Sequence, residues 1–230
     1  MNSHLRNEYL AAMGIRQWVL RESAAPAEVF PDVDTTQPVT DAPVGSPDWP
    51  VLQAQVAGCT RCALHATRTQ TVFGTGNRSA DWLVIGEAPG ADEDRQGEPF
   101  VGRAGQLLTE MLRAAGPGRE AVYITNILKC RPPNNRDPQS DEVASCHGYL
   151  ERQIELVKPR LILAVGRIAA HNLLQTDTPV GRLRGRVHHY GPAGIPLVVT
   201  YHPAYLLRSP LEKRKSWDDL QLALQISNGQ

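Results

Sequence analysis

Four short apolar segments constrain the fold of this chain more than any other feature. None of them alternates with polar residues. They lie at residues 82–85, 122–125, 161–165 and 197–200. Uninterrupted runs of this length are typical of strands that are buried on both faces of a sheet. Helical patterns separate or follow them, at residues 104–115, 140–157, 167–174 and 210–226. This alternation predicts an α/β fold in which a mostly parallel sheet lies between helical layers.

The composition of the first 48 residues differs from that of the rest. A loose apolar periodicity predicts a short N-terminal helix within residues 1–21, whereas residues 22–48 are rich in proline and show no sustained period. The second composition is typical of a disordered linker. We therefore expect a disordered N-terminal extension followed by one domain over residues 49–227. The N-terminal helix is either an uninvolved tail or a docking element for a protein partner.

Charge sets limits on how the chain can bind a nucleic acid. Lys and Arg together number 24, as do Asp and Glu, so the formal net charge is zero. Because nucleic-acid-binding proteins commonly carry a basic excess, any contact with DNA must come from a local basic surface. Basic residues gather at 182–186 and 213–215. We find neither a membrane-length apolar run nor a signal-peptide pattern, and we expect a cytoplasmic protein with no membrane partner.

Polar residues and tight turns follow each expected strand. Gly86–Gly90 follows the first, Asn126 the second, Gly166 the third and His202 the fourth. In open α/β sheets, ligands bind beyond the carboxyl ends of the strands. The sequence therefore predicts a site at this edge of the sheet.

The four cysteines need an explanation, since structural disulfides are rare in a reducing cytoplasm. They are Cys59, Cys62, Cys130 and Cys146. Four thiolates suit a tetrahedral zinc ion or a 4Fe–4S cluster. The absence of a second Cys-x-x-Cys pair makes a zinc ribbon a poor match, but the chemistry alone leaves zinc and iron–sulfur nearly even. Four unrelated buried thiols are the remaining alternative.

The glycine-rich segment at residues 86–108 superficially resembles a phosphate-binding loop. It matches neither the Walker pattern nor the dinucleotide fingerprint, and its acidic residues would repel a phosphate. Its first glycines more plausibly let backbone amides approach a neutral ligand.

Three motifs and the cysteine layout together resemble the family-four uracil-DNA glycosylases, over roughly residues 51–226. The motifs are GEAPGADEDRQGEPFVGRAGQLL, TNILKCRPPNNRDP and HPAYLLR. The resemblance implies a three-layer α/β/α sandwich and one 4Fe–4S cluster held by the four cysteines. It also implies hydrolysis of the N-glycosidic bond of deoxyuridine in single- or double-stranded DNA, which releases uracil and leaves an abasic site. We expect the enzyme to act as a monomer.

Three side chains are expected to recognise the flipped base. Phe100 would stack on it. The amide of Asn126 would donate to uracil O4 and accept from N3–H, an orientation that rejects cytosine. His202 would hydrogen-bond uracil O2 as negative charge develops on the departing base. The alternatives are a core phenylalanine, a turn-forming asparagine and a structural histidine.

The residue that activates water is less clear from the sequence. Glu87 is the best candidate. Better-known uracil-DNA glycosylases carry an aspartate at the next position, where this chain has Ala88, as family-four members do. Glu93 is a second carboxylate near the pocket, suited to holding its loop. Gly86 and Ala88 would contact the base through their backbone.

The expected DNA contacts lie in two segments. Leu206 or Leu207 would fill the gap left by the flipped base, with Arg208 on a phosphate. The alternative is that both leucines belong to the core face of a helix. Arg184, between Arg182 and Arg186, would contact phosphate from a loop, unless this is only a solvated basic turn.

Two other classes of function compete with a glycosylase. The first is a non-catalytic DNA-binding or scaffolding module that keeps the fold and the cluster, for which Ala88 leaves room. The second is a nucleotide-binding or phosphate-transfer enzyme, against which the missing Lys-Ser/Thr pair counts.

Overall fold

The computed structural model describes residues 48–229. The expected N-terminal helix, and all but the last residue of the expected linker, lie outside this range. The first described helix, α2 (Asp48–Ala57), begins one residue before the expected start of the domain. No helix within residues 48–229 is long and apolar enough to cross a membrane.

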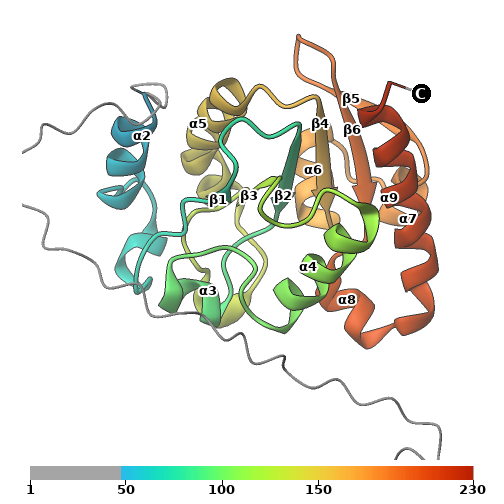
Figure 1. Ribbon diagram of the computed structural model, residues 1–230. Helices are drawn as coiled ribbons and strands as arrows, with labels where there is room; N and C mark the ends of the chain where they lie inside the picture. Colours follow the sequence, from blue (N-terminus) through green and yellow to red (C-terminus); the bar gives the residue numbers. More distant parts are fainter. Residues whose placement is uncertain (1–47, 230) are drawn as a thin grey trace, which may run out of the picture. The chain divides into compact units, whose positions relative to one another are not determined.

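A six-stranded sheet forms the centre of the described chain (Figure 1). The strands are β1 (Thr75–Gly76), β2 (Trp82–Gly86), β3 (Tyr123–Asn126), β4 (Leu161–Val165), β5 (Val187–Tyr190) and β6 (Ile195–Thr200). Their order is β1-β3-β2-β4-β6-β5. The four central strands are parallel, and the two edge strands pair antiparallel. The register pairs Gly86 with Asn126 and Val165 with Thr200, so the parallel strands end at one edge.

Helices surround this sheet. The α-helices after α2 are α3 (Ala91–Gln96), α4 (Arg103–Ala115), α5 (Ser140–Val157), α6 (Arg167–Leu174), α7 (Val180–Leu183), α8 (Pro203–Arg208) and α9 (Lys213–Ser227). Three short 3₁₀ turns are η1 (Ala63–Ala66), η2 (Pro133–Asn135) and η3 (Pro210–Glu212). The expected helix over residues 210–226 is divided, because Pro210 opens η3 and the regular helix begins at Lys213.

Alternate residues of the strands enter two separate cores. In β2, Leu83 and Ile85 pack with α2, α5 and α6, whereas Trp82 and Val84 pack with α4 and α9 on the other face. Because successive side chains of a strand point to opposite faces, a strand that is apolar throughout must be covered twice. The three-layer α/β/α architecture and the mostly parallel sheet are thus confirmed (Figure 1).

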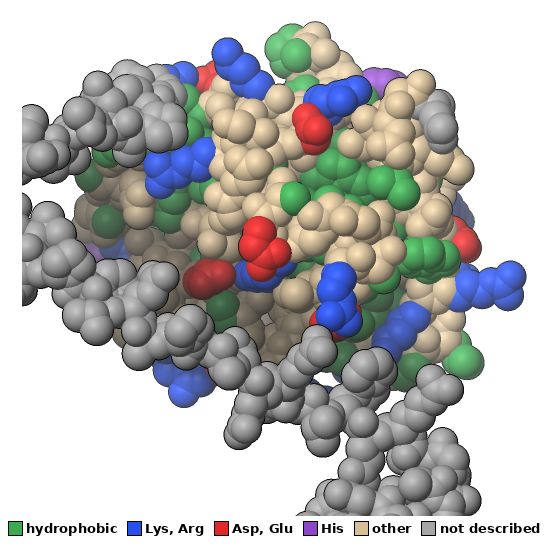
Figure 2. Space-filling view, in the orientation of Figure 1, with side chains coloured by type: hydrophobic (Ala, Val, Ile, Leu, Met, Phe, Trp, Pro, Cys, Tyr) green, Lys and Arg blue, Asp and Glu red, His purple; other side chains and the backbone are tan. Residues whose placement is uncertain are grey.

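Charged residues of both signs are interspersed on the visible face of the described chain (Figure 2). This distribution agrees with the zero formal net charge.

Candidate active site

A pocket of about 830 Å³ lies at the edge where the parallel strands end. Several side chains expected at the site line it together: Glu87, Ala88, Glu93, Phe100, Asn126 and His202. They come from the loops after β2 and β6, from the end of β3, from α3 and from the segment before α4. The fold therefore brings together residues that are more than 100 positions apart in the sequence.

Gly86 lies beneath two of these side chains. A Cβ at Gly86 would be 2.5 Å from Asn126 Oδ1 and 2.6 Å from Phe100 Cζ. Both distances are far below van der Waals contact, so only glycine leaves room for the amide and the ring. Gly86 is thus needed for the shape of the pocket floor.

Asn126 presents an unpaired acceptor. The residue is 2% exposed, and its Oδ1 has no hydrogen-bond partner within the described chain. A buried polar atom without a partner costs about 1–3 kcal/mol, so native proteins rarely keep one without a reason. Since Asn126 lines the pocket, a ligand N–H is a suitable partner for this oxygen.

The loop that carries Phe100 is tightly held. Phe100 has a φ of 55°, in the left-handed region, and a Cβ at Gly105 would lie only 1.8 Å from the Phe100 carbonyl oxygen. Glu93 accepts from the amides of Val101 and Gly102 at 3.0 Å each, and from the amide of Gly90 at 3.1 Å. Glu93 therefore fixes the loop backbone, consistent with its expected holding role.

His202 lies beside Phe100 in the pocket, with ring centroids 5.7 Å apart. Burial lowers the pKa of His202 to about 4; the charge of Arg208 acts in the same direction, and Glu93 opposes it. The imidazole is therefore neutral at physiological pH. Its Nδ1 accepts a hydrogen bond from the Ala204 amide at 3.2 Å, which places the single ring proton on Nε2.

The pKa of Glu87 is shifted in the opposite direction. Burial raises the pKa of Glu87 to about 6; the charge of Asp137 adds to this effect, and Arg167 opposes it. Arg167 and Asp137 themselves form an ion pair at 2.5 Å between Nη2 and Oδ2. Glu87 is thus a carboxylate at neutral pH that accepts a proton more readily than an ordinary glutamate.

The four cysteines line a second, smaller cavity. Cys59 and Cys62 follow α2, Cys130 follows β3, and Cys146 lies on α5. Arg68 Nη1 donates to Cys130 Sγ at 3.1 Å, and the Lys129 amide donates to Cys146 Sγ at 3.5 Å. Burial raises the pKa of the Cys130 thiol to about 11 and also raises that of Cys146.

The four thiols around this cavity are a donor set that suits a 4Fe–4S cluster or a tetrahedral zinc ion. Among the described residues, no group of three His, Cys, Asp or Glu side chains is arranged to hold a metal ion.

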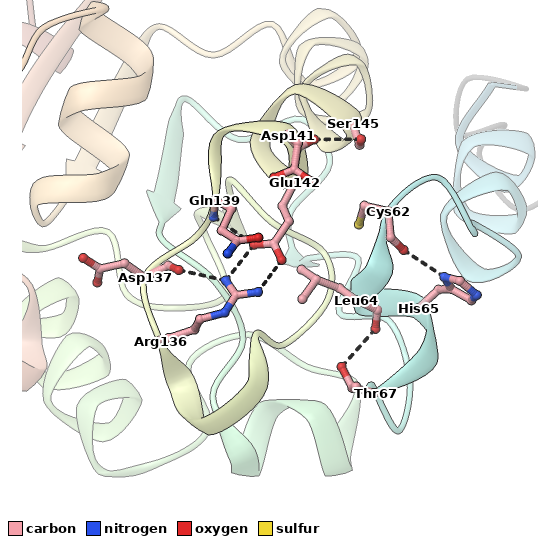
Figure 3. A network of polar contacts seen from close by, with 10 residues as sticks. All are labelled: Cys62, Leu64, His65, Thr67, Arg136, Asp137, Gln139, Asp141, Glu142 and Ser145. Atoms are coloured by element: carbon pink, nitrogen blue, oxygen red, sulfur yellow. Dashed lines mark hydrogen bonds and ion pairs between the residues drawn. The ribbon is translucent and has the colours of Figure 1, made fainter.

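The segment between Cys130 and Cys146 also forms part of the active-site pocket. Pro132, Asn135 and Arg136 line it. Both terminal nitrogens of Arg136 bond the buried carboxylate of Glu142, at 2.9 and 2.5 Å, and Glu142 accepts from the Gln139 amide at the start of α5 (Figure 3). The loop is thereby fastened to the helix that carries Cys146.

Two expected DNA contacts need correction. Leu206 is completely buried, because α8 packs on α4, so it cannot enter a duplex from this position. Leu207 is 37% exposed. Arg184 is 15% exposed, and its guanidinium pairs with the buried carboxylate of Asp219, which leaves it little freedom to bind phosphate. Arg208 is exposed and lines the pocket.

The sequence analysis gave no role to three arginines and one tyrosine that line the pocket. Arg103, Arg136, Arg167 and Tyr201 all line it. Tyr201 directly follows β6, and Arg167 lies two residues after the end of β4, so their position was a usable signal. Arg103 and Arg136 carried no such signal, because only the packing of their loops brings them to the pocket.

Comparisons with known proteins define first a class and then a family. A family model described as the uracil DNA glycosylase superfamily matches residues 73–221. The chain is 49% identical to a type-4 uracil-DNA glycosylase from Archaeoglobus fulgidus, over 68% of this chain and 81% of that protein. It is 43% identical to one from Pyrobaculum aerophilum, over 74% and 90%, and 44% identical to one from Thermotoga maritima, over 69% and 83%. The chain belongs to the type-4 uracil-DNA glycosylases.

Proposed function

We propose that this protein excises uracil from DNA by hydrolysing the N-glycosidic bond of deoxyuridine, and that Asn126, His202, Phe100 and Glu87 carry out the reaction. The observation that carries the proposal is the unpaired, buried Oδ1 of Asn126, which faces a pocket beside an aromatic ring and a neutral histidine. An enzyme acting on a base must first extrude it from the stack, and a pocket of this kind receives it. As a DNA repair enzyme it leaves an abasic site for later steps.

Base recognition falls to Asn126 and Phe100. The N3–H group of uracil donates to Asn126 Oδ1, and the Asn126 amide nitrogen donates to O4. Cytosine carries an acceptor at N3 and a donor at N4, so it would leave both groups of the amide opposed by like partners. The ring of Phe100 stacks on the base, and the backbones of Gly86 and Ala88 complete the floor.

His202 stabilises the departing base. As the glycosidic bond breaks, negative charge develops on uracil O2, and the Nε2–H group of the neutral imidazole donates to it. Such preorganised donors lower barriers by about 3 kcal/mol each. The low pKa of His202 keeps the ring neutral without weakening its donor.

Glu87 positions the attacking water. Its pKa of about 6 leaves it ionised at neutral pH and able to accept a hydrogen bond from water. Ala88 has no side-chain group for this task, which is why Glu87 is the water-activating residue of the proposal.

Cys59, Cys62, Cys130 and Cys146 hold one 4Fe–4S cluster. Support comes from their shared cavity and from the hydrogen bonds to Cys130 and Cys146. Bound there, the cluster cross-links α2, the loop after β3 and α5. The proposed chemistry uses none of its irons.

Leu207 and Arg208 contact the DNA. Leu207 fills the space left by the flipped nucleotide, and Arg208 binds a phosphate beside it. The substrate is uracil-containing DNA, single- or double-stranded, and the enzyme acts in the cytoplasm as a monomer. The N-terminal helix expected at residues 1–21 is a candidate docking element for a protein partner.

Cleavage of an oligonucleotide with a single uracil tests the proposal. The wild-type protein with its iron bound should release uracil, His202→Ala should lose that activity, and Asn126→Asp should gain some excision of cytosine. Asn228→Asp, in the exposed segment after α9, is the matched control and should behave as wild type. A wild-type protein that binds this DNA without excising uracil would instead be a non-catalytic binding module.

A further inference from the structure

Lys129 is a buried cation between the cysteine cavity and the uracil pocket. It follows β3, it is 1% exposed, and it lines the cavity of the four cysteines. Its Nζ lies 2.7 Å from each of three acceptors: Thr125 Oγ1, the Asn126 carbonyl oxygen and Gln153 Oε1. This side chain takes no part in the proposed recognition of uracil, and it is not one of the proposed cluster ligands.

The hydrogen-bond count identifies the form of Lys129. A lysine ammonium has three N–H donors, and the side chain meets three acceptors. A neutral amine has two donors and a lone pair, which would leave one acceptor facing that lone pair. The geometry is therefore that of a buried ammonium.

The hydrogen-bond partners of this ammonium are uncharged. A buried charge is costly unless an opposite charge compensates for it. Burial lowers the pKa of Lys129 to about 7, and the charges of Cys146 and Cys130 oppose this effect. The Lys129 amide itself donates to Cys146 Sγ at 3.5 Å.

We propose that Lys129 is a positioning residue, whose backbone amide is held by Cys146 Sγ and whose side chain in turn holds the backbone of Asn126. The bond from Nζ to the Asn126 carbonyl fixes the strand end from which the amide reaches the base. This inference rests on the proposed roles of Asn126 and of the cysteines.

The surrounding contacts extend this link to α5. Gln153 lies on α5, two turns beyond Cys146, and its Nε2 donates to the Phe73 carbonyl at 2.8 Å. Thr125 Oγ1 donates to the same carbonyl at 3.0 Å. Lys129 is therefore the centre of a buried network that joins β3, α5 and the segment before β1. A displacement of Lys129 would shift Asn126 relative to Phe100.

Lys129→Met tests the positioning role, because methionine has a similar length without donors. The iron-loaded variant should excise uracil about tenfold more slowly or worse in single turnover, the usual scale for residues that orient a functional group. Its affinity for DNA with a stable abasic analogue should stay within about twofold, because that DNA offers Asn126 no base. Lys158→Met, at the exposed end of α5, is the matched control.

Unchanged excision in Lys129→Met, or an equal loss of excision and of affinity for abasic DNA, would overturn the proposal.

Thr125→Val provides a second variant in case Lys129→Met does not fold. It removes one acceptor of Lys129 and keeps the side-chain shape, and a lost hydrogen bond of about 1 kcal/mol corresponds to about a fivefold slower excision. An unaltered rate would contradict the inference. Should wild type itself fail to excise uracil, the proposed function fails; should only the variants match wild type, this inference alone fails.

Discussion

At the scale of single residues, burial tunes the two ionisable groups of the pocket in opposite directions. It lowers the pKa of His202 to about 4 and raises that of Glu87 to about 6. In both cases the low-polarity surroundings disfavour the charged form, which is the cation for histidine and the anion for glutamate. The result at neutral pH is an uncharged donor on one wall and a basic carboxylate on another.

Because of Glu87, we expect the pH profile of the excision rate to have an acidic limb, in which the rate falls at low pH. Because only the carboxylate can accept a proton from water, the rate should fall as the pH drops below about 6, approaching tenfold per unit. Glu87→Gln should be slower at every pH and should lack this limb. Single-turnover rates between pH 4.5 and 8 check this, with the exposed Glu120→Gln as control. A rate for Glu87→Gln that still falls below pH 6 would assign the limb to another group.

The same pKa has a consequence for stability. Since the folded pKa of Glu87 exceeds that of the unfolded chain, the folded state binds this proton more tightly. Its contribution to stability is therefore fully present below pH 4.5 and is lost as the pH rises through about 6. Glu87→Gln should accordingly melt at a higher temperature than wild type at pH 8.

His202 should act without titrating. With a pKa near 4, the imidazole stays neutral from pH 5 upward, so it adds no limb to the rate in that range. His202→Ala should lower kcat/KM by about two to three orders of magnitude, the scale of losing a donor to a developing anion. Excision kinetics at pH 5 and 8 measure both effects, and the exposed His189→Ala serves as control. A loss confined to one end of this pH range would contradict a neutral donor.

The sequence identified the pocket residues better than the DNA contacts. Glu87, Phe100, Asn126 and His202 follow strands or lie in glycine-rich loops, and the ends of parallel strands must meet. For Leu206 and Leu207, only the packing of α8 decides which side chain is exposed. The fate of Arg184 likewise depends on Asp219, a residue of a helix 35 positions away. Their roles in DNA binding stay predictions.

At the scale of elements, the strands that could be predicted from the sequence are those buried on both faces of the sheet. Strands β2, β3, β4 and β6 have apolar runs for that reason. Strand β1 has two residues, and β5 is a partly exposed edge strand, so neither leaves such a pattern. Helices α3, α7 and α8 span at most six residues each, too few to show a helical period.

The start of α5 should depend on Glu142. This buried carboxylate accepts from the Gln139 amide and from Arg136, which holds its pKa below the usual range. The contribution to stability is therefore present above the unfolded pKa of about 4.5 and is lost as the pH falls through the lower folded value. Glu142→Gln should cost about 1 kcal/mol at pH 7, the scale of a lost helix cap, and less at pH 3.

Denaturant unfolding at the two pH values measures this effect. The control is Glu155→Gln on the same helix, whose partner Arg152 is solvent-accessible and whose pair should matter little. A cost for Glu142→Gln that does not change with pH would mean that the carboxylate charge is not what stabilises the start of α5. Because Arg136 lines the pocket, the same variant should also slow uracil excision.

At the scale of the whole molecule, a chain without net charge needs a local basic surface to bind DNA, and several cations lie around the pocket. The described surface mixes both signs (Figure 2), and the cations near the site are Arg103, Arg136, Arg167 and Arg208. They lie at the start of α4, after η2, at the start of α6 and at the end of α8, so their spacing depends on how these four segments are held. The pair of Arg136 with Glu142 fastens one of these segments, the loop that follows β3, to the helix that carries Cys146.

Removal of the cluster should therefore destabilise the fold, beginning with the region around the cysteines. Cys59 and Cys146 are separated by a long stretch of sequence, and a covalent link that closes a loop of this size stabilises a fold by about 4 kcal/mol. Pure anaerobic protein should be brown, and iron removal should lower its melting temperature. The α2–η1 region should become the first protease-sensitive segment within residues 48–229, because its link to α5 is lost.

Cys146→Ser tests this expectation against Ser145→Ala, a neighbour on the same helix that also lines the cavity. The first variant should lose visible colour, thermal stability and uracil excision together, whereas the second should keep all three. During cluster loss, proteolysis near α2 should precede the loss of uracil excision. The reason is that the cysteines affect the pocket through the loop after β3. A colourless wild-type protein with one zinc per chain would refute the cluster, and excision that vanishes before α2 loosens would place the cysteines in the chemistry itself.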